Sequence, residues 1–150
     1  MTFAPADAVD LLTSLLESTY NSIFRRIAEG SPYLDRASAE LRRPLEEMLV
    51  ANHRRAGELA ALLESLNSPR VIHISRHREE PYLAYLSLKF LLPKLVEEKR
   101  LCLARYENAI ANLSTFPALP PEVSALLESH REEQHKELAE LEHAAAHARR

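Results

Sequence analysis

Glu132 and His135 form the spacing in this chain that most directly indicates chemistry. On a helix, residues three apart share a face, and Glu-x-x-His can offer a carboxylate and an imidazole to a pair of iron or manganese ions. A complete site also needs a second such motif and a carboxylate from each of two further helices. Too few acids face inward for such a centre, so metal binding stays the alternative interpretation, with His53, Glu98, Glu132 and His135 as its ligands.

A second set of polar residues interrupts the apolar stripes near the middle of each predicted helix: Thr19, Asn52, Lys99, His130 and Gln134. Buried polar groups need hydrogen-bond partners, so these side chains predict a polar layer at the centre of a helical bundle. Such a layer can set the register of the helices without binding anything. We favour this interpretation, with no catalytic residue and no cofactor.

Composition excludes several other classes of function. The formal charge of −3 comes from 19 Lys and Arg against 22 Asp and Glu, with both signs interleaved. Such a balance gives no electrostatic basis for binding nucleic acid or an anionic membrane. The two glycines form no phosphate-binding loop, and no serine or cysteine lies in a nucleophile motif. The single cysteine, Cys102, and an N-terminus without the charged start of a secretion signal indicate a cytoplasmic protein.

The elements that must position these residues are helices. Apolar residues recur at steps of three and four over four stretches, which predicts amphipathic helices over 5–29, 36–66, 79–113 and 121–148. A chain of 150 residues is the size of one ordinary domain, so we expect residues 1–150 to form a single all-α, four-helix bundle.

The connections predict how the helices run. Residues 30–35 and 114–120 are short and rich in Gly, Pro and Ser, so each should join two antiparallel neighbours. The segment 67–80 is longer, and its fourteen residues, when extended, span about 45 Å, close to the length of a helix of about 30 residues. It could therefore cross the whole bundle, as in ferritin-like folds, and make the second and third helices run parallel.

Segment 81–96 is apolar nearly all round, unlike the other helices, but it is too short and too charged to span a bilayer. Tyr82, Leu86 and Phe90 face away from the core stripe. An apolar patch of this kind suggests a covered surface, and a second copy of the chain would make the protein a homo-oligomer. The crossover residues Val71–Ile74 could instead cover the same patch within one chain. The sequence does not distinguish this arrangement from contact with a second copy.

Several runs resemble the helical hairpins of an uncharacterised bacterial subgroup of the ferritin-like four-helix bundles. The first hairpin carries the likeness in Tyr20–Arg26, Asn52–Leu59 and Leu62–Leu66, and the second in Arg105–Ile110, Leu119–Val123 and Glu132–Leu138. The resemblance implies a ferritin-like bundle with a long crossover between its second and third helices. It also implies iron oxidation or storage, although only Glu132 and His135 match the ligand motif. A weaker resemblance of His53–Leu66 to metal-binding bundles of the damage-inducible type implies a site of three histidines.

The expectation is a self-associating, non-catalytic bundle with a metal-free polar centre. The alternative is an iron- or manganese-dependent oxidase or iron-handling protein.

Overall fold

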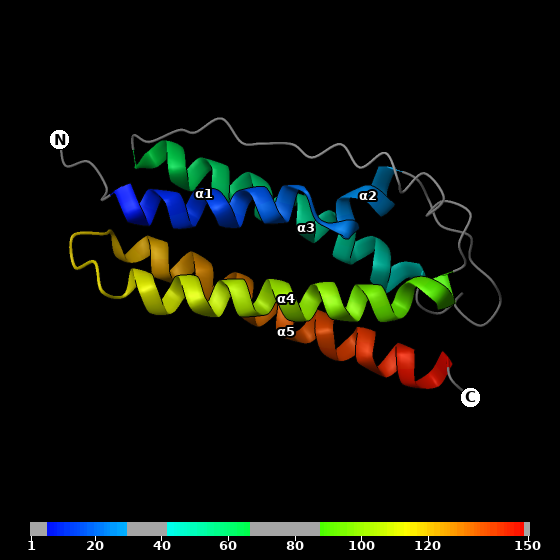
Figure 1. The fold of residues 1–150 in the computed structure, drawn as a ribbon. Coiled ribbons are helices and arrows are strands. Elements are labelled where there is room, and N and C mark those ends of the chain that lie inside the picture. The colour runs from blue at the N-terminus through cyan, green and yellow to red at the C-terminus, as the bar shows by residue number, and fades with distance from the viewer. Residues whose placement is uncertain (1–5, 30–41, 67–87, 149–150) are drawn as a thin grey trace.

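A computed structural model describes residues 6–29, 42–66 and 88–148 of the chain. These residues form five helical segments: α1 (Ala6–Tyr20), α2 (Ile23–Glu29), α3 (Arg42–Ser65), α4 (Leu88–Leu113) and α5 (Pro121–Ala148). No strand occurs in the described ranges. Since α1 and α2 follow one another along one side of the molecule, the architecture is a bundle of four helices, as the periodicity predicts (Figure 1).

Neighbouring helices in the bundle run in opposite directions. α1 packs against α3 and α4, and α5 packs against the same two helices, most extensively against α4. α3 and α4 make little contact with each other, and both run toward the end of the bundle where α1 begins (Figure 1). The second and third long helices therefore point the same way.

One prediction about the first helix is wrong. The stretch 5–29 was expected to be continuous, but the helix ends at Tyr20 and a new one begins at Ile23. The hydroxyls of Ser18 and Thr19 both donate to the Leu15 carbonyl, at 2.9 and 2.8 Å. Side chains that bond to the backbone in this way, followed by Asn21 and Ser22, weaken the helix at this point.

The connection between α4 and α5 is short and ordered by backbone bonds. Phe116 N–H donates to the Leu113 carbonyl, and Leu119 N–H donates to the Phe116 carbonyl. Pro121 is the first residue of α5, a position where the missing N–H costs nothing. The predicted helix 121–148 is confirmed.

Two apolar cores fill the two ends of the bundle. The first core joins α1 to the C-terminal half of α3, the C-terminal end of α4 and the start of α5: Ala8, Val9, Leu12, Leu15, Leu16, Ala56, Leu59, Leu63, Leu66, Tyr106, Ala109, Leu113, Val123 and Leu127. The second core joins α2 to the opposite ends of the same helices: Ile23, Phe24, Ile27, Leu45, Met48, Leu91, Leu92, Leu95, Val96 and Leu141. The break between α1 and α2 lies where the first core ends and the second begins.

Some expectations fall outside the described residues. These are the crossover 67–80, the start of the second predicted helix, the start of the third, and the side chains of Tyr82 and Leu86. Phe90 belongs to α4, but its side chain is not described. None of the described helices has the length and apolar character needed to cross a lipid bilayer.

Candidate functional site

A cluster of buried charges separates the two cores. Arg55 of α3 and Lys99 of α4 each expose only 1% of their surface. The Arg55 guanidinium donates to both oxygens of Glu137 on α5, at 2.7 and 2.9 Å, and to Glu133 at 3.1 Å. Lys99 Nζ donates to Glu137 at 2.8 Å. One carboxylate thus holds two cations, and we call Arg55, Lys99, Glu133 and Glu137 the central ionic cluster.

Helix geometry explains why these charged residues face inward. Inward residues of α5 alternate in steps of four and three through Leu127, His130, Gln134, Glu137 and Leu141. This spacing keeps one seam of a helix against its partners. Arg55 lies on the same kind of seam in α3, three residues after Asn52 and four before Leu59. Lys99 follows Leu95 by four residues in α4.

Gln134 and Cys102 extend the cluster toward the first core. The Gln134 side-chain oxygen accepts hydrogen bonds from the Cys102 thiol at 2.9 Å and from Lys99 at 3.4 Å. The Gln134 Nε2 group is buried and has no hydrogen-bond partner within the part of the chain that the structure describes. On the other side, Lys99 Nζ lies 4.3 Å from the centre of the Phe24 ring, where the face of the ring attracts a cation. Lys99 therefore contacts α2 as well as α5.

A second polar chain runs through His130, which is fully buried. Its Nδ1 lies 2.9 Å from the Tyr106 hydroxyl, and its Nε2 lies 3.4 Å from Glu58 Oε1. A carboxylate can only accept, so the proton sits on Nε2 and Tyr106 donates to Nδ1. Glu58 is also paired with Arg54, which bridges to Glu133 of the central ionic cluster.

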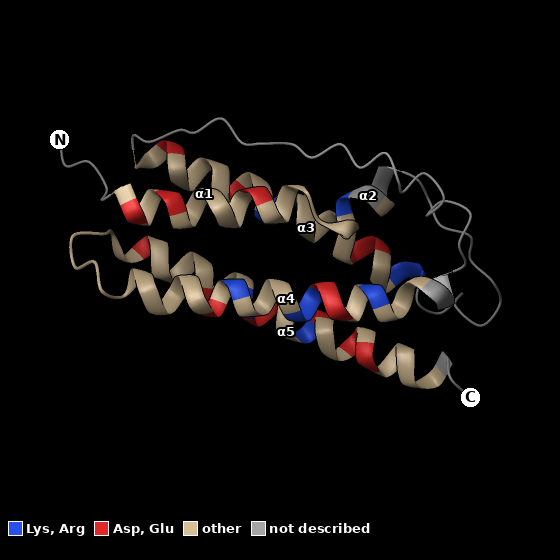
Figure 2. Cartoon of the chain, in the orientation of Figure 1, with Lys and Arg blue, Asp and Glu red and all other residues tan. Residues whose placement is uncertain are grey.

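The ionised groups of this network balance. Glu58, Glu133 and Glu137 carry three negative charges, and Arg54, Arg55 and Lys99 carry three positive ones. Elsewhere, acidic and basic positions are interleaved along α3, α4 and α5, whereas α1 carries acidic positions only (Figure 2).

Burial and pairing shift the ionisation of these groups. Burial raises the pKa of a carboxyl group, but in Glu137 the bonds from Arg55 and the charge of Lys99 outweigh burial, and its pKa is lowered. Burial likewise opposes the charge of Arg55, yet its bonds to Glu137 raise the guanidinium pKa. The pKa of Lys99 is lowered because burial outweighs the attraction of Glu137. Burial also lowers the pKa of His130.

Thr19 and Asn52 lie at the break between α1 and α2. The Asn52 amide donates to the Thr19 carbonyl at 3.4 Å, and Arg25 donates to the Tyr20 carbonyl at 3.1 Å. In a continuous helix these two carbonyls would accept N–H groups from the next turn. Both side chains therefore replace bonds that the break removes.

The five residues of the predicted polar layer, Thr19, Asn52, Lys99, His130 and Gln134, are all buried. Lys99 and Gln134 belong with the central ionic cluster, and His130 lies in the second polar chain. Thr19 and Asn52 lie at the helix break. The prediction missed Arg55, Glu133, Glu137 and Tyr106. The same three-and-four spacing that selected Asn52 and Gln134 also passes through Arg55 and Glu137, which is the signal that could have found them.

The four candidate metal ligands do not come together. His53, Glu132 and His135 are exposed and Glu98 is half-buried. His135 lies 3.7 Å from Glu107, which it meets across the α4–α5 surface. Within the described part of the chain, no group of three or more His, Cys, Asp or Glu side chains could hold a metal ion. The residues named for iron or manganese therefore do not fit a dinuclear centre.

Comparisons with protein-family models, with curated proteins and with solved structures give no match to this chain.

Proposed function

We propose that this protein is a non-catalytic helical bundle that acts by self-association, with a central polar layer that needs no metal. The observation that carries the proposal is the Glu137 carboxylate, which accepts hydrogen bonds from both Arg55 and Lys99. A metal ion at the bundle centre would need carboxylates that are free to bind it. Here the inward acids are neutralised by the protein's own cations.

The central ionic cluster has a structural use. Burying charges is costly, and apolar residues of similar volume often stabilise a fold as well or better. Polar groups within a bundle can instead select one register of the helices over others. Arg55, Lys99 and Glu137 lie on three different helices, so only one alignment of α3, α4 and α5 pairs them all.

The competing proposal is an iron- or manganese-dependent oxidase or iron-handling protein. Elemental analysis of protein purified without an affinity tag separates the two. We expect far less than one equivalent of iron, manganese or zinc per chain. One or more equivalents would overturn the metal-free proposal, and loss of that metal in His135→Ala would support the Glu-x-x-His site.

Self-association through Tyr82, Leu86 and Phe90 is part of the proposal. Its support is the excess of apolar residues in 81–96 over what one buried helix face needs. Light scattering at micromolar concentration should give a dimer or larger assembly, and Phe90→Glu should reduce it. A monomer would remove this part of the proposal.

A ferritin-like topology is the finer form of the fold that we propose. The common direction of α3 and α4 supports it, because consecutive helices that run parallel are a feature of ferritin-like folds. An experimental structure that traces residues 67–87 would test the crossover.

We also propose a cytoplasmic location without a nucleic-acid partner, which cell fractionation and a DNA-binding assay at low salt would test.

A further inference from the structure

Two histidines lie one turn apart near the end of α5, His143 and His147. Both side chains are exposed. Their rings lie side by side, with centres 4.1 Å apart. Residues four apart share one face of a helix, so the helix holds the two rings next to each other before any ligand binds.

A bond to the backbone sets the orientation of the His147 ring. Its Nδ1 lies 2.9 Å from the carbonyl oxygen of His143. A carbonyl can only accept, so Nδ1 carries the proton, and Nε2 of the neutral ring keeps a free lone pair. Histidines that bind metal ions commonly donate from their other nitrogen to a carbonyl or a carboxylate in this way. His147 therefore presents Nε2 as a ligand.

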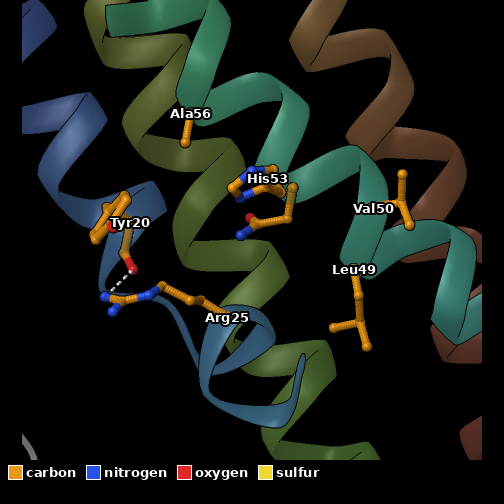
Figure 3. A pocket seen from close by; sticks show the side chains of 7 residues that line it. Tyr20, Arg25, Leu49, Val50, His53 and Ala56 are labelled. Carbon is orange, nitrogen blue, oxygen red and sulfur yellow. Dashed lines mark hydrogen bonds between the residues drawn. The ribbon is translucent and has the colours of Figure 1, made fainter. Parts of the chain in front are cut away.

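The other histidines of the described ranges have no such neighbour. His130 is buried and bonded through both of its nitrogens. His135 lies opposite an acid of α4. His53 lines the open pocket between the α1–α2 break and α3, and the positions one turn away from it are Leu49 and Gly57 (Figure 3). Among the described residues, two imidazoles come together only at the end of α5.

Two adjacent imidazoles suit a divalent transition-metal ion. Imidazole is a favoured ligand of zinc, copper and nickel. A zinc–nitrogen bond is about 2.0–2.1 Å long, so two nitrogens on one ion lie at most about 4 Å apart. The separation of the two ring centres is of the same size. No third His, Cys, Asp or Glu side chain joins the pair within the described ranges, so water would fill the remaining positions on the ion.

We propose that His143 and His147 chelate one divalent transition-metal ion through their Nε2 atoms. Copper(II) should bind most tightly, because it forms the strongest complexes of the divalent first-row ions. The site lies on the exposed face of α5 and shares no residue with the central ionic cluster. The proposal therefore does not depend on the metal-free bundle centre, and His147→Ala would leave any metal bound at that centre in place.

The probe is the copper(II) complex of iminodiacetate, which keeps coordination positions open to protein ligands. The full chain, treated first with a chelator, is titrated with the probe, and pulsed electron paramagnetic resonance identifies the nitrogen ligands of the copper. We expect one saturable site per chain with two imidazole nitrogens. His147→Ala should bind the probe at least about tenfold more weakly, because a single imidazole lacks the second, intramolecular bond.

The matched control is His53→Ala, the same change at an exposed histidine without a histidine one turn away. It should bind like the unmodified chain. Adding Ala139→His to His147→Ala places an exposed histidine one turn before His143 and should restore binding. Thermal unfolding by circular dichroism confirms that each variant folds. No saturable binding, equal effects of His147→Ala and His53→Ala, or copper with a single imidazole would overturn the proposal.

Discussion

Arg55 and Glu137 face each other across the contact of α3 and α5, joined by two parallel hydrogen bonds of 2.7 and 2.9 Å. This fork-to-fork geometry is the strongest form of a side-chain ion pair because both partners are charged and both bonds are aligned. Arg55 is almost completely buried and Glu137 exposes 12% of its side chain. Removing one partner of such a pair and replacing both partners by apolar residues should have different effects on the free energy of unfolding.

Glu137→Leu should strongly destabilise the protein. The change leaves Lys99 without its carboxylate and Arg55 with Glu133 alone. Removing one partner of a buried ion pair typically costs about 3–5 kcal/mol, since the remaining charge stays desolvated. Urea unfolding followed by circular dichroism measures the loss. Arg100→Ala, which breaks the exposed Arg100–Glu142 pair, is the control and should cost less than about 1 kcal/mol.

A triple variant, Arg55→Met, Lys99→Met and Glu137→Met, should recover most of the stability lost in Glu137→Leu. Apolar residues of similar volume remove the desolvation cost together with the charges. If the cluster sets helix register, the triple variant should also show broadened amide signals in NMR spectra. A triple variant as unstable as Glu137→Leu would show that the ion pairs themselves stabilise the fold.

Ser22→Ala should stabilise the protein by about 1 kcal/mol. The Ser22 hydroxyl is buried at the break and has no hydrogen-bond partner among the described residues, so removing it ends a desolvation cost that no bond offsets. Ser18→Ala is the comparison variant, because the Ser18 hydroxyl donates to the Leu15 carbonyl. Its loss gives up a hydrogen bond while it removes a competitor of the helix backbone, so the gain should be smaller than in Ser22→Ala. The midpoints of thermal unfolding compare the two variants. A destabilised Ser22→Ala would mean that the hydroxyl is bonded in solution.

His130 should make stability depend on pH between about 5 and 7. Its pKa in the folded protein is lowered from the ordinary 6.5, mainly by burial and against the attraction of Glu58. The unfolded chain therefore takes up the proton first as the pH falls. Stability is fully present above pH 6.5 and decreases below it, with a slope of at most about 1.4 kcal/mol per pH unit.

His130→Gln should flatten this slope, because glutamine does not titrate. Urea unfolding of both chains at several pH values between 5 and 7.5 provides the measurement. The lowered pKa of Glu137 adds a further loss at lower pH, where its carboxylate takes up a proton, so the comparison stays above pH 5. An identical slope in the two chains would contradict the assignment to His130.

Cys102 should react slowly in the folded protein. Its thiol donates to Gln134, and burial raises its pKa, so little of the reactive thiolate forms at neutral pH. Labelling with a chromogenic disulfide reagent should be at least about tenfold slower in buffer than in 6 M guanidinium, because the partly buried thiol is bonded to Gln134 and little of its thiolate forms. Equal rates in the two solutions would place the thiol on an accessible surface.

The sequence alone was sufficient to predict most of the described helical segments and much of their inward faces, although not the break in the first helix. The steps of three and four residues in 121–148 are unambiguous, and α5 has the predicted bounds. Lys99, His130 and Gln134 were placed inward because each interrupts an apolar stripe, and all three are buried. Local periodicity carries this information, since a helix side chain's direction depends only on its position along the turn.

Only the tertiary structure decided where the first helix breaks and which charges are buried. The inward spacing fits Arg55 and Ala56 equally well, and it fits Glu137 and Leu138 equally well. Of two such neighbours, the charged side chain is normally the one that stays in water. Arg55 and Glu137 are 82 residues apart in the chain, and each is buried because the other lies opposite. At the break, the Thr19 carbonyl accepts from Asn52 on another helix as well as from the Ser22 N–H. A pairing between distant residues leaves no trace in the periodicity of either segment.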